Sequence, residues 1–289
     1  MKILKWIGYA LLTILLLATA FYIKAYVSTE NRLSKKYNYT LQPFEVKTDS
    51  AIVAEGHRIL KTKGCKSCHG EDLAGKVWLD DAMLGRIVTP NLTKGKGGLP
   101  KDYSTHDWLR SLKHGLKRDS TPLRIMPSHE ISHLGEEDMN ALIAYLSQLQ
   151  PVDHELPETS LGVLAYVLTD LDQILLIPAD SIDHSRPLTK GVSREVSVKF
   201  GEYLSANCSG CHRKNMKGGP PLAPGFPVVA DISSTGNPGK WSEEQFINTL
   251  KTGTTPEGKK LKAEEMPWIA FKNYNETEMK ALYLFLKSM

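Results

Sequence analysis

The sequence Cys-x-x-Cys-His occurs twice, at the end of AIVAEGHRILKTKGCKSCH (51–69) and at the end of VSVKFGEYLSANCSGCH (196–212). Aligning Gly56 with Gly201 leaves the first copy two residues longer before its first cysteine. All the cysteines of the protein belong to these two copies, and a disulfide framework would not need such symmetry. They are Cys65, Cys68, Cys208 and Cys211.

The likeness between the two copies continues downstream of each histidine. Each copy has a Gly/Pro-rich stretch, a helical segment led by a tryptophan, a Met-Pro pair and a final amphipathic helix. The matched segments are 89–100 and 217–227, 106–116 and 241–250, 126–127 and 266–267, and 136–149 and 276–288. In the final helices the matched apolar residues are Ala141, Leu142 and Leu146, and Ala281, Leu282 and Leu286. Internal duplication is the simplest account of this pattern.

Length and composition agree with an ordinary folded protein of two small domains. The 289 residues are 41% hydrophobic and 24% charged, and a net charge of +4 is too small to argue for nucleic acid. Because strand signals are few, we expect an all-α fold with long loops. Residues 51–150 and 195–289 should form tandem domains. The acidic linker 151–194 between them should contain a helix over 161–177, packed against or between the domains.

Residues 1–24 are expected to be a membrane anchor. Between Lys5 and Lys24 lie 18 residues without a charge, which is just enough to cross a bilayer at about 1.5 Å per residue. The rival is a cleaved signal peptide, because Ala18-Thr19-Ala20 fits a small-residue cleavage site. The apolar run continues past that site, which favours an uncleaved anchor. Residues 25–50 are polar and mixed, and should form a tether.

The Cys-x-x-Cys-His motif attaches haem covalently. Two cysteines on one helical turn can both reach the vinyl groups of a haem, and the histidine that follows then points its imidazole at the iron. We therefore expect two covalently bound haem c groups. Cys65 and Cys68 should hold one, and Cys208 and Cys211 the other. The expected proximal ligands are His69 and His212.

Two other chemistries fit these cysteines less well. A redox dithiol does not explain a histidine in both copies. A zinc site built from two Cys-x-x-Cys pairs usually has them about fifteen to twenty residues apart. Here the pairs are 143 residues apart and belong to different copies.

The second axial ligand is expected to be methionine in each half, because an electron carrier usually closes its haem iron with Met or a second His. Met126 and Met266 share their position, the proline that follows, and a loop context that lets a thioether reach across a haem face. Met139 and Met279 lie in the final helices at core-like positions. Met83 has no counterpart in the second copy.

Alternatives to these ligands stay open at the level of sequence. In the first half, His129 and His133 are the serious candidates for a second histidine ligand. In the second half no histidine follows His212, so the rival methionines are Met216 and Met289, together with the core-like Met279. Lysine ligation also stays open.

On these motifs the chain resembles a membrane-anchored dihaem cytochrome c. The first half further resembles the cytochrome c subunits of membrane-bound alcohol, aldehyde and related dehydrogenases. Those subunits commonly carry three haems, whereas this sequence has two motifs. The resemblance implies a compact helical fold around each haem, on the outer side of the bacterial inner membrane. The matching residues are Thr89-Pro90-Asn91-Leu92-Thr93, Trp108, Ile125-Met126-Pro127-Ser128 and Asp138-Met139-Asn140-Ala141-Leu142.

We therefore expect a dihaem c-type cytochrome rather than an enzyme, with no catalytic residues. It should pass electrons one at a time between a membrane-associated dehydrogenase and a quinone, a soluble cytochrome or a terminal oxidase. The expected location is the inner membrane, with a single span and the haem domains on the periplasmic side. The alternative is a dihaem oxidoreductase such as a peroxidase, which needs one haem iron open or openable to its substrate.

Overall fold

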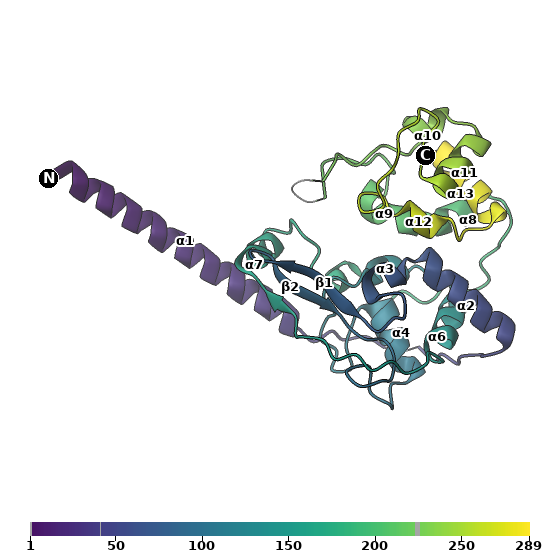
Figure 1. Ribbon diagram of the computed structural model, residues 1–289, viewed down its shortest axis with the longest axis horizontal. Coiled ribbons are helices and arrows are strands. Elements are labelled where there is room, and N and C mark those ends of the chain that lie inside the picture. Colours follow the sequence, from purple (N-terminus) through teal and green to yellow (C-terminus); the bar gives the residue numbers. More distant parts are fainter. Residues whose placement is uncertain (1, 41, 223–225) are drawn as a thin grey trace.

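The computed structural model describes residues 2–40, 42–222 and 226–289. A long helix, α1, projects from a body of two small helical domains (Figure 1). The expected mostly helical fold is confirmed. The first part of the chain contains α1 (Lys2–Ser34), α2 (Ser50–Thr62), α3 (Cys65–His69), α4 (Thr105–His114), α5 (Ser128–Ile131), α6 (Glu136–Leu146) and α7 (Val163–Asp170). A 3₁₀ turn, η1 (Pro178–Ser181), precedes α8 (Val198–Leu204), α9 (Ala206–His212), α10 (Asn237–Lys240), α11 (Glu243–Thr252), α12 (Trp268–Phe271) and α13 (Glu276–Ser288).

The two domains repeat one order of elements, in which α2, α3, α4, α5 and α6 correspond to α8, α9, α11, α12 and α13. The helices α4 and α11 begin with equivalent capping boxes, at Ser104 and at Ser242. Counting from these caps, Trp108 corresponds to Phe246, and Trp241 corresponds to Tyr103. The tryptophans that lead the two segments in the sequence are therefore not equivalent in the fold.

A close helix crossing forms the centre of each domain. α2 packs against α6, and α8 packs against α13, more extensively than any other pair of helices. A Cβ atom added to Gly56 would lie 1.9 Å from the carbonyl oxygen of Ala141, and one added to Gly201 would lie 2.0 Å from that of Ala281. Glycine is thus required where the helices touch. The apolar residues matched in the final helices are buried here, as expected.

A small antiparallel sheet adds to the helical fold of the first domain. β1 (Lys76–Asp81) and β2 (Gly85–Thr89) form a hairpin, and β3 (Ser160–Leu161) pairs with β2. Gly85 has a φ of +89°, and a Cβ there would lie 2.2 Å from the carbonyl oxygen of Ser160. The β-branched residues of the hairpin favour strands, but the sequence analysis did not single them out.

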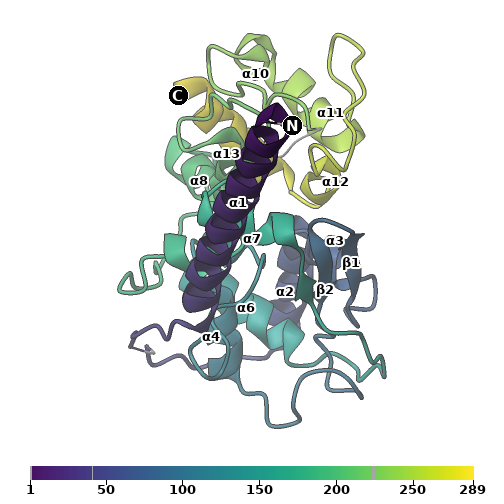
Figure 2. The same ribbon diagram turned by 90° about the vertical axis from the view of Figure 1, so that its left-hand side faces the viewer.

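The helix α1 is long and apolar enough to cross a membrane. Its N-terminal apolar side chains are exposed, whereas Ala25, Thr29 and Leu33 are buried near its C-terminal end. The helix continues to Ser34, ten residues beyond the predicted limit of the anchor. This extension is covered by α7, as Figure 2 shows.

The connecting segments differ in part from what was expected. The linker helix, α7, was expected against or between the two domains; its start bonds to Met83 of the first domain, and its principal helix partner is α1. The predicted tether, 25–50, is helical as far as Ser34. Beyond that point Tyr37 is buried, and Phe44 and Val46 pack against the core of the first domain. Apolar side chains spaced through a polar segment thus attach it to the body.

We predict that Gly56→Ala destabilises the protein by about 1–3 kcal/mol, because the added methyl group meets the backbone of α6. Helix propensity alone would favour alanine by about 1 kcal/mol, so the sign of the change tests the crossing. Chemical denaturation followed by circular dichroism measures it. Ala54→Leu, on the exposed side of α2, should change the free energy of unfolding by less than about 0.5 kcal/mol. A Gly56→Ala protein as stable as the native one would contradict the prediction.

Candidate haem sites

The first attachment motif occupies the short helix α3, which starts after Gly64 in the left-handed conformation. Cys65, Cys68 and His69 lie within this helix, and His69 is only 6% exposed. Its Nδ1 atom lies 3.0 Å from the carbonyl oxygen of Pro90, which leaves Nε2 free to bind a metal. Burial lowers the pKa of His69, which favours the neutral imidazole that a metal requires.

The segment after β2 holds this attachment helix from one side. Thr89 donates its hydroxyl to the carbonyl oxygen of Cys68 at 2.6 Å, and Leu92 donates its amide to Leu73 at 2.9 Å. The side chain of Asn91 accepts the amide of Thr93 at 2.9 Å. The Thr-Pro-Asn-Leu-Thr stretch singled out in the sequence therefore fixes the turn whose Pro90 carbonyl orients the histidine.

The second motif repeats this arrangement with other residues. The Nδ1 atom of His212, on α9, lies 2.8 Å from the carbonyl oxygen of Ala230. Ile232 donates its amide to Met216 at 2.8 Å, and the Asp231 carboxylate accepts the amide of Ser233 at 2.8 Å. Burial lowers the pKa of His212 as well. Val229-Ala230-Asp231-Ile232-Ser233 is thus the counterpart of the Thr-Pro-Asn-Leu-Thr stretch, a match that sequence identity does not reveal.

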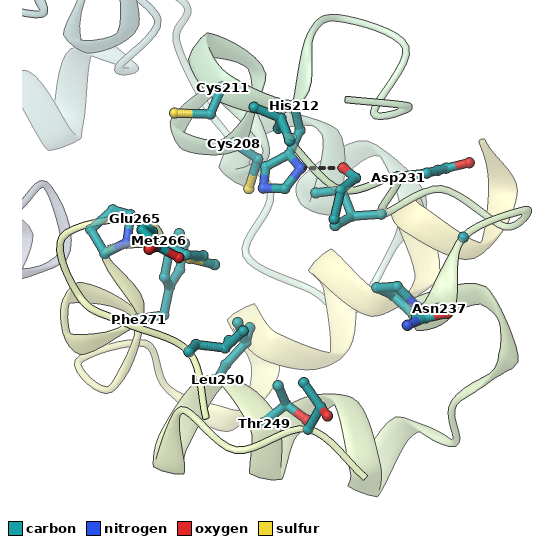
Figure 3. Close-up of a pocket in the computed structure, with 18 of the residues that line it drawn as sticks. Cys208, Cys211, His212, Asp231, Asn237, Thr249, Leu250, Glu265, Met266 and Phe271 are labelled. Carbon is teal, nitrogen blue, oxygen red and sulfur yellow. Dashed lines mark hydrogen bonds between the residues drawn. The ribbon is translucent and has the colours of Figure 1, made fainter. Parts of the chain in front are cut away.

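A cavity of about 430 Å³ opens beside the second motif. This volume lies in the range of ligand-binding pockets. Cys208, Cys211 and His212 form one side of the cavity, and Met266 and Leu250 line other walls (Figure 3). The lining is mostly apolar, as a haem ring requires.

The Met-Pro segments have the same backbone geometry in both domains. Pro127 has φ −74° and ψ 49°, and Pro267 has φ −75° and ψ 53°. The residue after each proline donates its amide to the methionine carbonyl oxygen at 2.6 Å. Met126 packs against the core of the first domain, and Met266 lines the cavity of the second.

The rival methionines occupy other kinds of position. Met139 and Met279 are fully buried in the two cores, and Met83 is 55% exposed at the hairpin tip. Met216 is buried with a φ of +59° and corresponds to Leu73, whose φ is +61°. These placements favour the two methionines of the Met-Pro pairs.

The two rival histidines follow Met126 on or near α5. His133 lies with its Nδ1 atom 3.0 Å from a guanidinium nitrogen of Arg186. Burial lowers the pKa of His133, to about 4. The Nε2 atom of His129 lies 3.8 Å from the Glu130 carboxylate, and its buried Nδ1 has no partner among the described residues. His129 therefore remains the stronger of the two rivals.

The four thiols do not have the properties of a redox dithiol. They are all free, and burial raises the pKa of Cys65 and of Cys208 to about 12. Reactive cysteines have a lowered pKa instead. Within residues 2–40, 42–222 and 226–289, no group of three or more His, Cys, Asp or Glu side chains could hold a metal ion by itself.

The second attachment helix, α9, lies where the two domains meet. α5 of the first domain contacts α9 of the second. Lys63, two residues before Cys65, donates its ammonium group to the side chain of Asn207 at 2.5 Å, next to Cys208. Burial raises the pKa of Glu130 on α5 to about 7 and lowers that of Lys63.

An ion pair fastens the domains beside these helices. Arg58 on α2 donates two hydrogen bonds to the carboxylate of Glu278 on α13, each 2.8 Å long. It also binds Glu55 on its own helix at 2.7 Å. Glu278 is almost completely buried, so removing Arg58 would leave an uncompensated charge inside the interface.

Comparison with known proteins gives the family of the chain. The family model of cytochrome c matches residues 53–150 and again residues 200–289. The chain belongs to the cytochrome c family. The predicted family and the predicted role of electron carrier are therefore confirmed, and the family implies covalently bound haem c.

Several curated proteins are similar to this cytochrome. The fructose dehydrogenase cytochrome subunit of Gluconobacter japonicus is 28% identical over 241 residues, which cover 75% of this chain and 49% of the relative. The cytochrome c subunit of the quinone alcohol dehydrogenase of Komagataeibacter europaeus is 25% identical over 237 residues, or 71% of this chain and 48% of the relative. The chain thus spans about half the length of these relatives.

A buried polar atom tests whether the first domain of this cytochrome fits a haem. The indole Nε1 of Trp108 is buried and has no hydrogen-bond partner among the described residues. A buried donor without an acceptor is costly, and haem carries carboxylate groups that can accept such a bond. Together with the freed Nε2 of His69, this donor fits the group. The domains differ here, because the counterpart of Trp108 is the apolar Phe246.

We predict that Trp108→Phe shifts one of two haem midpoint potentials and leaves the other unchanged, because only the first domain loses a donor. The haem-loaded protein should also lose about 1 kcal/mol of stability. A spectroelectrochemical titration and thermal unfolding measure the two effects. Trp78→Phe is the control, since Trp78 is 45% exposed on β1. Equal effects of the two changes would refute this role for Trp108.

Proposed function

We propose that this cytochrome carries two haem c groups and relays electrons from a membrane-associated dehydrogenase to a quinone, a soluble cytochrome or a terminal oxidase. One observation carries the proposal. Both halves repeat the same local geometry: the motif histidine is held through Nδ1 by a backbone carbonyl, and the Met-Pro segment has nearly the same backbone angles. A protein with only one haem site would not need the same histidine and Met-Pro geometry in both domains.

The proposed site residues have the same roles in each domain: two cysteines attach the haem, and a histidine and a methionine bind the iron. Cys65 and Cys68 would hold one haem, and Cys208 and Cys211 the other. Such haems supply one-electron transfer between Fe(III) and Fe(II). His69 and His212 would orient neutral imidazoles toward iron, while Met126 and Met266 would close the opposite faces and exclude substrate. Methionine ligation raises the potential relative to a second histidine.

The proposed partners rest on the relatives. Their names describe cytochrome subunits of fructose and alcohol dehydrogenases. We infer that this cytochrome, with two proposed haem sites in adjacent domains, accepts electrons from such an enzyme. The domain interface favours this proposal, because Lys63 at the end of α2 bonds to Asn207 on α9, and Arg58 on α2 pairs with Glu278 on α13.

We also propose a single membrane span over residues 6–23, with the body on the outer side of the inner membrane. Covalent haem attachment of this kind, expected in that compartment from the family resemblance, sets the orientation. The proposed cytochrome domains are 51–150 and 195–289. The last third of α1, residues 24–34, then belongs to the water-soluble body rather than to the anchor.

Changing Cys65 and Cys68 together to Ala should remove one of two covalently bound haems. Haem staining of the denatured chain and the pyridine haemochrome spectrum should each fall to half, while the spectrum of the second domain remains. The double change of Cys208 and Cys211 is the matched experiment. Two retained haems after either change would contradict the attachment sites.

Replacing the methionine ligands should move the two potentials separately. Met126→His should lower one midpoint potential and Met266→His the other, because imidazole stabilises Fe(III) more than a thioether does. Met139→Leu and Met279→Leu, in the fully buried cores, should leave both potentials nearly unchanged. They should cost less than about 1.5 kcal/mol of stability. Optical titration of the four variants measures these shifts.

The spin state of the oxidised protein separates the carrier from the alternative enzyme. Two iron sites closed by methionine should give a low-spin protein with thioether-to-iron charge-transfer absorption from both. A high-spin haem in the resting protein, with rapid turnover of peroxide, would mean that one iron is open. That result would replace the carrier by the dihaem peroxidase.

A further inference from the structure

The helix α7 is more apolar than a helix on a water-facing surface should be. Its sequence is VLAYVLTD, and among its residues only Ala165 and Thr169 are buried. Val163 is 52% exposed, and Leu171, which follows the helix, is 47% exposed. A helix with apolar residues all round normally lies inside a protein or in contact with lipid. The uncovered side of α7 therefore needs a partner.

The position of α7 indicates which partner it has. The helix packs on α1 directly after the uncharged segment that ends at Lys24, and it buries Ala25 and Thr29 completely. Asp170 at its end accepts a hydrogen bond from Lys24 at 2.5 Å. In both views α7 lies on the side of the body from which α1 projects. It is thus next to the plane in which α1 would leave a bilayer.

The tip of the β1–β2 hairpin continues the apolar surface of α7. The amide of Leu164 donates to the carbonyl oxygen of Met83 at 3.0 Å, so the tip is joined to the start of the helix. Met83 is 55% exposed. We call Tyr26, Met83 and Val163, together with the neighbouring face of α7, the juxtamembrane patch.

Three tyrosines, including Tyr26 of the patch itself, cluster where α1 meets α7. The ring centroid of Tyr166 lies 4.9 Å from that of Tyr26 and 6.4 Å from that of Tyr22. The hydroxyl of Tyr166 donates to Glu30 at 2.7 Å, toward the body. Tyrosines concentrate at membrane–water boundaries because their rings are apolar and their hydroxyls are polar. A cluster from two separate helices marks such a boundary here.

We propose that the juxtamembrane patch rests in the lipid headgroup region of the bilayer that α1 spans, as a second contact between the body and the membrane. This inference rests on the proposed anchoring by α1 and adds a surface of the body itself. Burial of apolar area provides the binding. The acidic groups near the patch are already engaged, since Asp80 pairs with Arg86 and Asp81 accepts the amides of Met83 and Leu84. Contact should therefore occur on neutral lipid and persist in high salt.

Spin labels at Met83→Cys and Val163→Cys test the contact. The full haem-loaded chain is reconstituted alone into phosphatidylcholine vesicles, and collisions of each label with oxygen and with a water-soluble nickel chelate are measured. A lipid-embedded position gains oxygen collisions and loses nickel collisions several-fold relative to an aqueous one. The unsubstituted chain gives the background labelling, and an unchanged haem spectrum shows that each variant is folded.

Two further labels keep the outcomes distinct. Leu15→Cys lies in the uncharged part of α1 and reports the anchor itself. Leu284→Cys on α13, 37% exposed and in the domain away from α1, reports an aqueous apolar position.

Lipid contact at Met83 and Val163 as well as at Leu15 supports the proposal. If Leu15 is in lipid while Met83 and Val163 resemble Leu284, the anchor stands and the second contact is refuted. A partner subunit would then be the cover for the patch. If Leu15 is also aqueous, both the anchor and the contact fail.

Discussion

The crossing of the first and last helix of each domain is the constraint on which the rest of the structure depends. At Gly56 and Gly201 the backbones touch so closely that no side chain fits between them. That contact joins the beginning and the end of each domain, because Gly56 and Ala141 are 85 residues apart in the sequence and Gly201 and Ala281 are 80 apart. The loops between the two helices contain few regular elements, and they can be irregular because the crossing and the buried core fix their ends.

Each crossing also positions the two walls of a haem site. The attachment helix follows the first helix of the crossing directly, and the Met-Pro loop comes shortly before the last one. In the proposed haem sites, the helix contact would therefore contribute to the relative position of histidine and methionine. The second domain has 58 residues from Cys208 to Met266 and the first has 61 from Cys65 to Met126, yet the two Met-Pro segments have nearly the same backbone angles.

Much of this arrangement could be predicted from the sequence, since covalent attachment and helical periodicity leave strong local patterns. The duplication, the helical class and the burial of Leu142 and Leu282 follow from such patterns. The equivalence of Trp108 with Phe246 could not be predicted, because capping boxes rather than residue identity define it. The place of α7 was also missed. Its apolar run is compatible with several neighbours, and only the tertiary contacts with Ala25 and Thr29 select α1.

The continuity of α1 with the body determines how this cytochrome can meet its partners. Residues 24–34 continue α1 as one helix for about 16 Å, and α7 packs against it. The connection between the apolar part of α1 and the body is therefore stiff. A flexible linker would let the domains sweep a volume whose radius grows with linker length. A stiff helical connection would instead keep each proposed haem site at a constant distance from the membrane surface and in a constant orientation. If α1 spans a membrane as proposed, encounters would depend on diffusion within the membrane plane, and a partner would have to present its own redox centre at the matching height.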